Sequence, residues 1–312
     1  MPTPLRSIPR VCDVTWVRGA RAPADAAPDV LLEVPHGATK AEHFASLRAE
    51  LVGVYPDDLV DFFFVNTDVG APEVAERLAA RLVAADPTRT ALVVRCRLPR
   101  TFVDCNRVIS PDAVAAPSVA GAMTPGLMPW VTHAADRRLL LERYGAYRGL
   151  VEQAVSQVMG ARGIALFVHT YAPRSVDVAV DARIVESLHD AYRPDVVRRW
   201  PLRPEVDLIT RDPEGRRLAD EGLVAALRAA FARAGIPTAE DHAYTLQPST
   251  LAAVHAARFP GRTLCFEMRR DLLVEEFAPF AEMRVAPEKA ERFADILAEA
   301  IGAWKRPAVS PA

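Results

Sequence analysis

The chain has 312 residues, of which 50% are hydrophobic and 25% are charged, so it is long enough to bury a full core and a deep site. Its formal net charge of −2 argues against a general binder of nucleic-acid backbones, which needs a basic surface. It has neither the apolar core of a signal peptide nor a run of about 18 apolar residues that would predict a membrane helix, so we expect a cytoplasmic protein with no membrane partner.

Short apolar runs alternate with amphipathic stretches along the chain. The apolar runs predict buried strands over 30–35, 62–65, 91–96, 164–170, 206–210 and 263–268. Apolar side chains at helical spacing predict helices over 71–86, 136–159, 221–235 and 287–304. This alternation predicts an α/β fold with a mixed, mostly parallel sheet.

The chain contains no internal repeat or linker that would divide it, so we expect a single domain over 1–312. Residues 1–27 precede the first apolar run and are expected to be an N-terminal extension. Two long irregular stretches, 108–132 and 171–204, are predicted to be loops that form the walls of an active site.

Polar side chains follow the predicted strands. In open α/β sheets, sites form beyond the carboxyl ends of strands. His36 follows the first apolar run, Asp68 follows the second, and His169 lies at the end of the fourth. Two imidazoles and a carboxylate are suitable ligands for a catalytic zinc ion. Each histidine alone is more typical of a hydrogen-bonded structural residue, and Asp68 could cap the following helix, whereas the three residues together at strand ends favour the metal site.

A second group of polar residues lies in the segment RTFVDCNR. Arg100 and Arg107 are natural partners for a carboxylate, and Asn106 adds an amide donor. Asp104 could orient one of the arginines. Near a metal, this group would bind an anionic substrate and stabilise a developing oxyanion, whereas alone it is typical of a surface ion-pair cluster.

Glu267 ends a strongly apolar strand, where a carboxylate is costly unless it is paired or functional. Beside a metal site it would act as a general base and then protonate the leaving amine. The alternative is a buried salt bridge to Arg269 or Arg270. His242 and Tyr244, in a later loop, are weaker candidates for hydrogen bonds to a substrate.

The order of these segments, from about residue 28 to 276, resembles the N-formylglutamate amidohydrolase family. That family belongs to the wider zinc carboxypeptidase-like group, with succinylglutamate desuccinylase and aspartoacylase. The motifs that carry the resemblance are EVPHGA, NTDVGAPEVAERL, RTFVDCNR, LFVHTY and CFEMRRDLL. PHGA stands where the family has Pro-His-Ser-Gly, and the HTY segment lacks the neighbouring Asp and Ser. These departures argue against N-formylglutamate itself as the substrate and leave metal-hydrolase chemistry intact.

The resemblance implies a three-layer α/β/α fold and one zinc ion held by His36, Asp68 and His169. It also implies that Arg100 polarises the scissile carbonyl and that Glu267 is the catalytic base. The predicted substrate-binding residues are Asn106, Arg107, His242, Tyr244 and Arg270.

We therefore predict a zinc-dependent amidohydrolase that acts on a small anionic N-formyl or N-acyl amino acid. Glu33 and Glu42 remain alternatives to Asp68 as the carboxylate ligand. Two other classes stay open, namely a metal-free protein that binds an anion on the same fold and a zinc carboxypeptidase-type peptidase. A nucleophile such as Cys105 has less support, because the chain has no GxSxG motif and no well-placed Cys–His pair.

Overall fold

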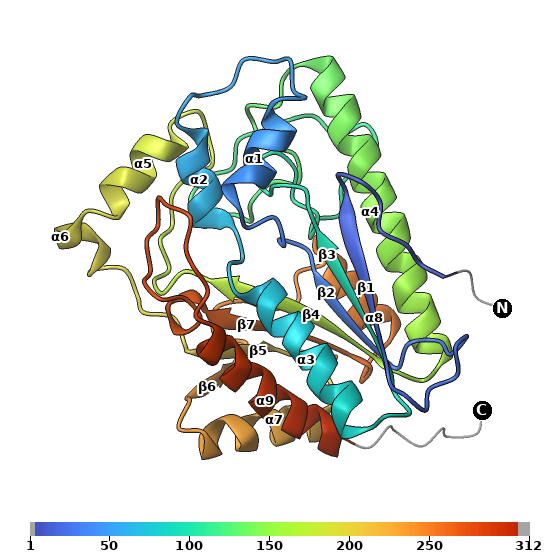
Figure 1. Ribbon diagram of the computed structural model, residues 1–312. Helices are drawn as coiled ribbons and strands as arrows, with labels where there is room; N and C mark the ends of the chain where they lie inside the picture. The colour runs from blue at the N-terminus through green and yellow to red at the C-terminus, as the bar shows by residue number, and fades with distance from the viewer. Residues whose placement is uncertain (1–3, 305–312) are drawn as a thin grey trace.

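The computed structural model describes residues 4–304, in which seven strands form one mixed sheet with the order β1-β3-β2-β4-β7-β5-β6 (Figure 1). The strands are β1 (Cys12–Arg18), β2 (Val30–Val34), β3 (Thr90–Cys96), β4 (Ile164–Tyr171), β5 (Val206–Ile209), β6 (Thr238–Glu240) and β7 (Thr263–Arg269). The central strands β3, β2, β4 and β7 run parallel, whereas β1 is antiparallel to β3 and β5 to β7. The carboxyl ends of the four parallel strands therefore meet at one edge of the sheet.

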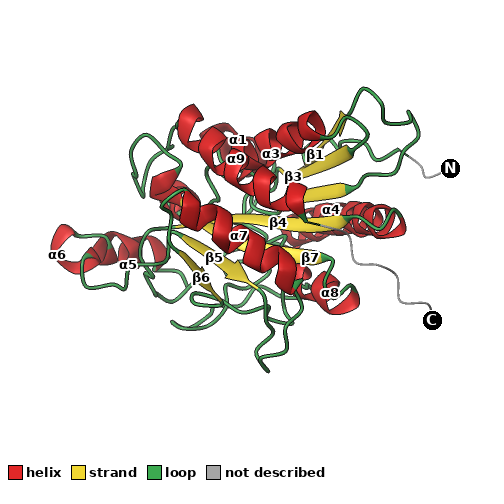
Figure 2. Ribbon diagram, turned by 90° about the horizontal axis from the view of Figure 1, so that it is seen from below, coloured by secondary structure: helices red, strands yellow, loops and turns green. Residues whose placement is uncertain are grey.

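Helices cover both faces of this sheet (Figure 2). They are α1 (Ala41–Arg48), α2 (Leu59–Asn66), α3 (Ala71–Ala85), α4 (Ala134–Gly160), α5 (Ile184–Ala191), α6 (Pro194–Val197), α7 (Glu221–Arg233), α8 (Leu251–Arg258) and α9 (Pro287–Ala303), with a 3-10 turn at Arg270–Leu272. Helices α3, α7 and α9 pack together on one face, and α4 and α8 lie on the other. The predicted three-layer α/β class with a mixed, mostly parallel sheet is confirmed.

Strand β2 packs against helices on both faces of the sheet. Val30 and Leu32 belong to the core shared with α3, α7 and α9, whereas Leu31 belongs to the core on the α4 side. Side chains of a strand alternate between the faces, so a strand that is buried on both reads as one continuous apolar run. Glu33 shares the face of Leu31, and Tyr147 of α4 donates a hydrogen bond to its carboxylate.

The predicted strand over 62–65 is wrong, because these residues lie inside helix α2. Its side chains Phe62, Phe63 and Phe64 are all buried, so the helix is apolar on several faces. A run of four apolar residues does not distinguish a buried strand from a buried helical turn by its periodicity alone.

Two segments expected to be irregular carry regular structure. Residues 12–18, within the expected N-terminal extension, form the edge strand β1. The stretch 171–204 contains α5 and α6. Residues 1–3 and 305–312 of the expected domain lie outside the described part of the chain. Between residues 4 and 304, none of the helices combines the length and apolar character needed to span a bilayer.

The start of helix α3 depends on Gly70, which has φ +94°. A Cβ atom there would lie 2.7 Å from Cδ1 of Leu273. We expect Gly70→Ala to lower the free energy of unfolding by about 2–4 kcal/mol, because the change combines a left-handed backbone with a steric clash. Urea denaturation measures this change.

The matched control is Gly235→Ala, since Gly235 has φ +72° and open space around its Cα. This variant should lose only the backbone contribution of about 1–2 kcal/mol. Equal losses in the two variants would contradict a role for the Leu273 contact.

Candidate active site

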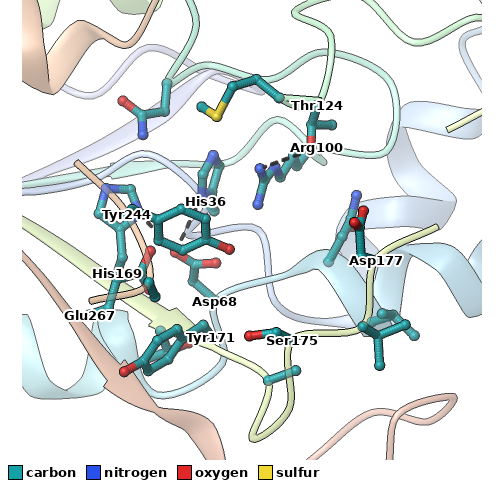
Figure 3. Close-up of a pocket in the computed structure, with 18 of the residues that line it drawn as sticks. His36, Asp68, Arg100, Thr124, His169, Tyr171, Ser175, Asp177, Tyr244 and Glu267 are labelled. Atoms are coloured by element: carbon teal, nitrogen blue, oxygen red, sulfur yellow. Dashed lines mark hydrogen bonds and ion pairs between the residues drawn. The ribbon is translucent and has the colours of Figure 1, made fainter. Parts of the chain in front are cut away.

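Three buried side chains meet at the carboxyl edge of the parallel strands. His36 follows β2 by two residues, His169 lies in β4, and Asp68 lies in the turn between α2 and α3. Nδ1 of His36 is 3.2 Å from Oδ2 of Asp68, and Nδ1 of His169 is 3.0 Å from the same oxygen. Figure 3 shows both rings turned toward this carboxylate. The structure thus brings together the three residues predicted as metal ligands.

The turn after α2 presents the Asp68 carboxylate to the two rings. The Asp68 N–H donates to the carbonyl oxygen of His36 (3.4 Å), and the Asp68 carbonyl accepts from the N–H of Ala71 (3.1 Å). The Asp68 side chain does not cap α3, whose N-cap residue is Gly70. Burial alone would raise the pKa of Asp68, but His36 and His169 hold that pKa well below its ordinary value, so the carboxylate is ionised.

The geometry of these donor atoms fits a divalent metal ion. One nitrogen or oxygen atom of each residue lies within 4.8 Å of the others. A tetrahedral ion with bonds of about 2.0–2.2 Å holds its ligand atoms about 3.3 Å apart, close to the two distances measured to Asp68 Oδ2. Two imidazoles and one carboxylate are also the ligand types that such an ion takes.

Asp104 connects this group to the neighbouring arginines. Its Oδ1 lies 2.8 Å from Nε2 of His36, and its Oδ2 accepts from Nε of Arg100 at 2.9 Å. Nη2 of Arg107 lies 3.5 Å from Oδ2, and the Asn106 N–H donates to Oδ1 at 2.9 Å. Burial would raise the pKa of Asp104, but Arg100 and Arg107 hold that pKa well below its ordinary value. A carboxylate on the second ring nitrogen leaves Nδ1 of His36 for a metal, as is usual for metal-bound histidines.

Glu267 lies next to His169, because β4 and β7 are paired in register at these two residues. Burial raises the pKa of Glu267 to about 7. Within residues 4–304, no group forms a hydrogen bond with its Oε2 atom. The salt bridge considered from the sequence does not form, because Arg269 pairs with Asp271 and Arg270 donates to backbone carbonyls. Glu267 is therefore a partly buried carboxyl group, with its Oε2 atom out of contact with solvent, whose raised pKa suits proton exchange near neutral pH.

A cavity of about 520 Å³ opens over these groups. Every residue predicted for the site lines it except His242, which is exposed and whose N–H donates to Asp207. Both long stretches expected to be loops contribute to the lining, through Thr124 from the first and Ser175 from the second. Cys105 lies in the core, where burial raises the pKa of its thiol well above its ordinary value, so the cavity gives no support to a cysteine nucleophile.

The two alternative carboxylate ligands, Glu33 and Glu42, do not lie between the two imidazoles. Glu42 is exposed beside His43, at 3.6 Å from its Nε2. Glu33 is buried on the α4 side of the sheet, where Tyr147 donates to it, and burial raises its pKa to about 7. Asp68 is thus the carboxylate that lies between the two imidazoles.

Sequence reasoning missed Arg203, which lines the same cavity. Its Nη2 donates to the hydroxyl of Tyr244 at 3.0 Å, and its Nε donates to Oγ of Ser175 at 3.1 Å. Arg203 lies in the irregular stretch before β5, in an arginine-rich chain, so the sequence pattern around it carries no signal for a site.

No protein-family model and no curated protein sequence matches this chain. Among solved structures, the gene product Atu2144 from Agrobacterium tumefaciens is similar, with 20% identity, 93% of each chain covered and a TM-score of 0.53. The similar structures include an N-formylglutamate amidohydrolase from Ralstonia eutropha JMP134, with 18% identity, 93% of this chain and 96% of that chain covered, and a TM-score of 0.49.

A metallo-carboxypeptidase from Burkholderia cenocepacia is also among the similar structures, with 10% identity, 96% of this chain and 65% of that chain covered, and a TM-score of 0.38. At these identities the likeness concerns the fold.

Asp104 provides a test of the metal centre. We expect Asp104→Asn to weaken Zn²⁺ binding by about 10–100-fold, because His36 loses the carboxylate that orients its ring. Competition with a chromophoric chelator measures the affinity, and circular dichroism checks the fold. The control is Asp212→Asn, which removes a buried carboxylate that pairs with Arg216 at 2.9 Å. Equal Zn²⁺ affinity in the wild type and the folded Asp104 variant would contradict the assignment.

The raised pKa of Glu33 can be tested through the pH dependence of the protein's stability. A carboxyl group whose pKa is raised in the folded state destabilises the fold as pH rises through the range from its ordinary value to about 7. In the metal-free protein, Glu33→Gln should therefore match the wild type near pH 5 and be more stable by about 1–3 kcal/mol at pH 8. Urea denaturation at both pH values measures the difference.

Glu50→Gln is a control of opposite sign. A hydrogen bond from Arg143 lowers the pKa of Glu50, so its ionised form stabilises the fold above its ordinary pKa. This variant should be less stable than the wild type at pH 8. If the stability of Glu33→Gln relative to the wild type is the same at pH 5 and pH 8, ionisation of Glu33 does not destabilise the fold, which would contradict the raised pKa.

Proposed function

We propose that this chain is a zinc-dependent hydrolase that cleaves the amide bond of a small anionic N-formyl or N-acyl amino acid. One observation carries the proposal, namely the convergence of Nδ1 of His36 and Nδ1 of His169 on Oδ2 of Asp68, at 3.2 and 3.0 Å, beside the partly buried carboxyl group of Glu267. Three protein ligands with an open fourth position are characteristic of catalytic rather than structural zinc. The cavity of about 520 Å³ lies over the open side.

The bound ion would acidify a water molecule and polarise the scissile carbonyl. Glu267 would take a proton from the attacking water at its carboxylate and pass it to the nitrogen of the departing amine. A carbon–oxygen bond forms, the carbon–nitrogen bond breaks, and one water molecule is consumed. A pKa of about 7 suits a residue that must act as a base and then as an acid near neutral pH.

Arg100 would stabilise the charge that develops on the carbonyl oxygen. Its Nε is held by Asp104, and the guanidinium lines the cavity with further N–H groups to donate. Because Asp104 also binds His36, the same carboxylate sets the position of Arg100 relative to the metal ligands. A donor fixed in advance of the reaction is the arrangement that electrostatic stabilisation of an oxyanion requires.

Arg107 and Asn106 would bind the carboxylate of the substrate. Arg107 is almost fully buried, and its Nε donates to the carbonyl of Thr124 at 2.9 Å, which fixes the plane of the guanidinium. Asn106 lines the cavity beside it. The motif order that resembles the N-formylglutamate amidohydrolase family supports an amide carbon–nitrogen bond as the one cleaved.

Glu267→Gln tests the proposed function. We expect the variant to bind one equivalent of Zn²⁺ like the wild type and to lose turnover of N-formyl or N-acetyl amino acids by about 10²–10⁴-fold, because the proton carrier is gone. Elemental analysis measures the metal, and amine release measures turnover.

His169→Ala should instead lose both the metal and the activity, whereas His255→Ala removes a buried histidine that stacks on Phe167 and should keep the metal. Near-wild-type turnover by Glu267→Gln would overturn the role of Glu267. A wild-type enzyme that stays fully active after complete removal of metal would overturn the proposed function itself.

A further inference from the structure

One side of the cavity carries positive charge that the proposed reaction does not use. Arg203 and Arg270 both line the cavity, and within residues 4–304 no carboxylate forms an ion pair with either guanidinium. Arg100 and Arg107 differ in this respect, because Asp104 lies within 3.5 Å of both. Arg100 and Arg107 thus share a counter-ion in the protein, whereas Arg203 and Arg270 form no ion pair among the described residues; Arg174 also lines the cavity and donates to the backbone carbonyls of Arg198 and Trp200.

Arg270 is the more buried member of the second pair, with only 2% of its surface exposed. It donates from Nη1 to the carbonyl of Val65 at 3.0 Å and from Nη2 to the carbonyl of Thr170 at 3.5 Å. Its Nε has no hydrogen-bond partner among the described residues. A guanidinium stays charged at any physiological pH, and the carboxylates of Asp68 and Glu267 act on Arg270 without forming an ion pair with it. A ligand anion that contacts Arg270 directly would therefore further offset the cost of its burial.

Arg203 is held in place from two sides by aromatic rings. Its guanidinium carbon lies 5.1 Å from the ring centre of Tyr171 and 5.6 Å from that of Tyr244. Hydrogen bonds to Ser175 and to the Tyr244 hydroxyl fix its orientation. A guanidinium has five N–H groups, so donors remain for a ligand. The arrangement is ordered before any ligand binds, which lowers the entropic cost of binding an anion.

The order of the strands places the metal ligands between the two arginine pairs. Arg100 and Arg107 follow β3, whereas Arg270 follows β7 and Arg203 precedes β5. Strands β2 and β4, which position His36 and His169, lie between β3 and β7. In Figure 3, Arg100 lies on one side of Asp68 and Tyr171, which stacks with Arg203, lies on the other. The two arginine pairs therefore come from opposite sides of the strands that carry the two histidines.

We propose that Arg203 and Arg270 form a second anion-binding subsite, which takes a carboxylate carried by the acyl group of the substrate. This inference rests on the proposed function, in which Asn106 and Arg107 bind the carboxylate of the amino acid on the other side of the scissile bond. The substrate class is then an N-acyl amino acid whose acyl group comes from a dicarboxylic acid. Hydrolysis consumes one water molecule and releases the dicarboxylate and the amino acid.

The experiment compares three substrates in the Zn²⁺-loaded protein: N-succinylalanine, N-acetylalanine and N-acetylglutamate. The wild type should have its highest kcat/KM with N-succinylalanine. In Arg203→Gln, the ratio of kcat/KM for N-succinylalanine to that for N-acetylalanine should fall by about 10–100-fold, as expected for the loss of a hydrogen bond between charged groups. Arg216→Gln, which removes an exposed arginine paired with Asp212, is the charge-matched control and should leave the ratio unchanged.

Two kinetic results would overturn the subsite. An unchanged ratio in Arg203→Gln would show that Arg203 does not contact the acyl group. A wild-type preference for N-acetylglutamate over N-succinylalanine would place the second anion on the amine side of the scissile bond.

Calorimetry of succinate binding separates the subsite from the proposed function. Succinate should bind the Zn²⁺-loaded wild type at least about tenfold more tightly than Arg203→Gln, since only the wild type offers both arginines. Such Arg203-dependent binding, without hydrolysis of any of the three substrates, would support the subsite and overturn the proposed function. Equal binding of succinate by the wild type and Arg203→Gln would overturn the subsite.

Discussion

The interaction on which the site depends is the sharing of one buried carboxylate oxygen, Oδ2 of Asp68, by Nδ1 atoms of His36 and His169. All three side chains are removed from water, so their polar atoms must be satisfied by one another or by a bound cation. The parallel sheet enforces the meeting, because adjacent strands deliver their carboxyl ends to the same edge. A left-handed glycine at the start of α3 allows the chain to turn just after Asp68.

Charge is distributed unequally around this centre. Asp104 contacts His36 and two arginines at once, so the proposed metal ligand and the residues proposed to hold the reacting carbonyl and the substrate carboxylate are fixed by one buried anion. Arg203 and Arg270 form no ion pair with a carboxylate among the described residues, and Asp68 and Glu267 act on Arg270 only without direct pairing. This asymmetry divides the cavity into an end where a carboxylate contacts the arginines and an end where none does, with the partly buried carboxyl group of Glu267 beside His169. A ligand complementary to this cavity carries a negative charge at the end that Arg203 and Arg270 line.

Much of the site could be predicted from the sequence, because the carboxyl ends of parallel strands collect polar residues by a general rule of α/β folds. The rule selected His36 and His169 for the right reason. It selected Asp68 for a wrong one, because the preceding apolar run is helix α2 and the residue reaches the site through a turn. The bond between Asp104 and His36 joins residues 68 positions apart, which no local pattern records.

Arg203 lies outside the reach of sequence reasoning for the same reason, since its aromatic neighbours come from β4 and from a loop after β6. The edge strand β1 was missed because its side chains are mostly only partly buried, so it lacks the apolar run of a central strand. The loop residue His242 was selected on its residue type alone, and the loop turns its side chain toward solvent.

The central claim is that one ion is bound by residues from three separate segments of the chain, and crystallography of the zinc-loaded protein tests it most directly. Diffraction data collected on both sides of the zinc absorption edge should show one anomalous peak within about 2.0–2.2 Å of Nδ1 of His36, Nδ1 of His169 and a carboxylate oxygen of Asp68. A peak at other residues, no peak at all, or two imidazoles too far apart to share an ion would contradict the account.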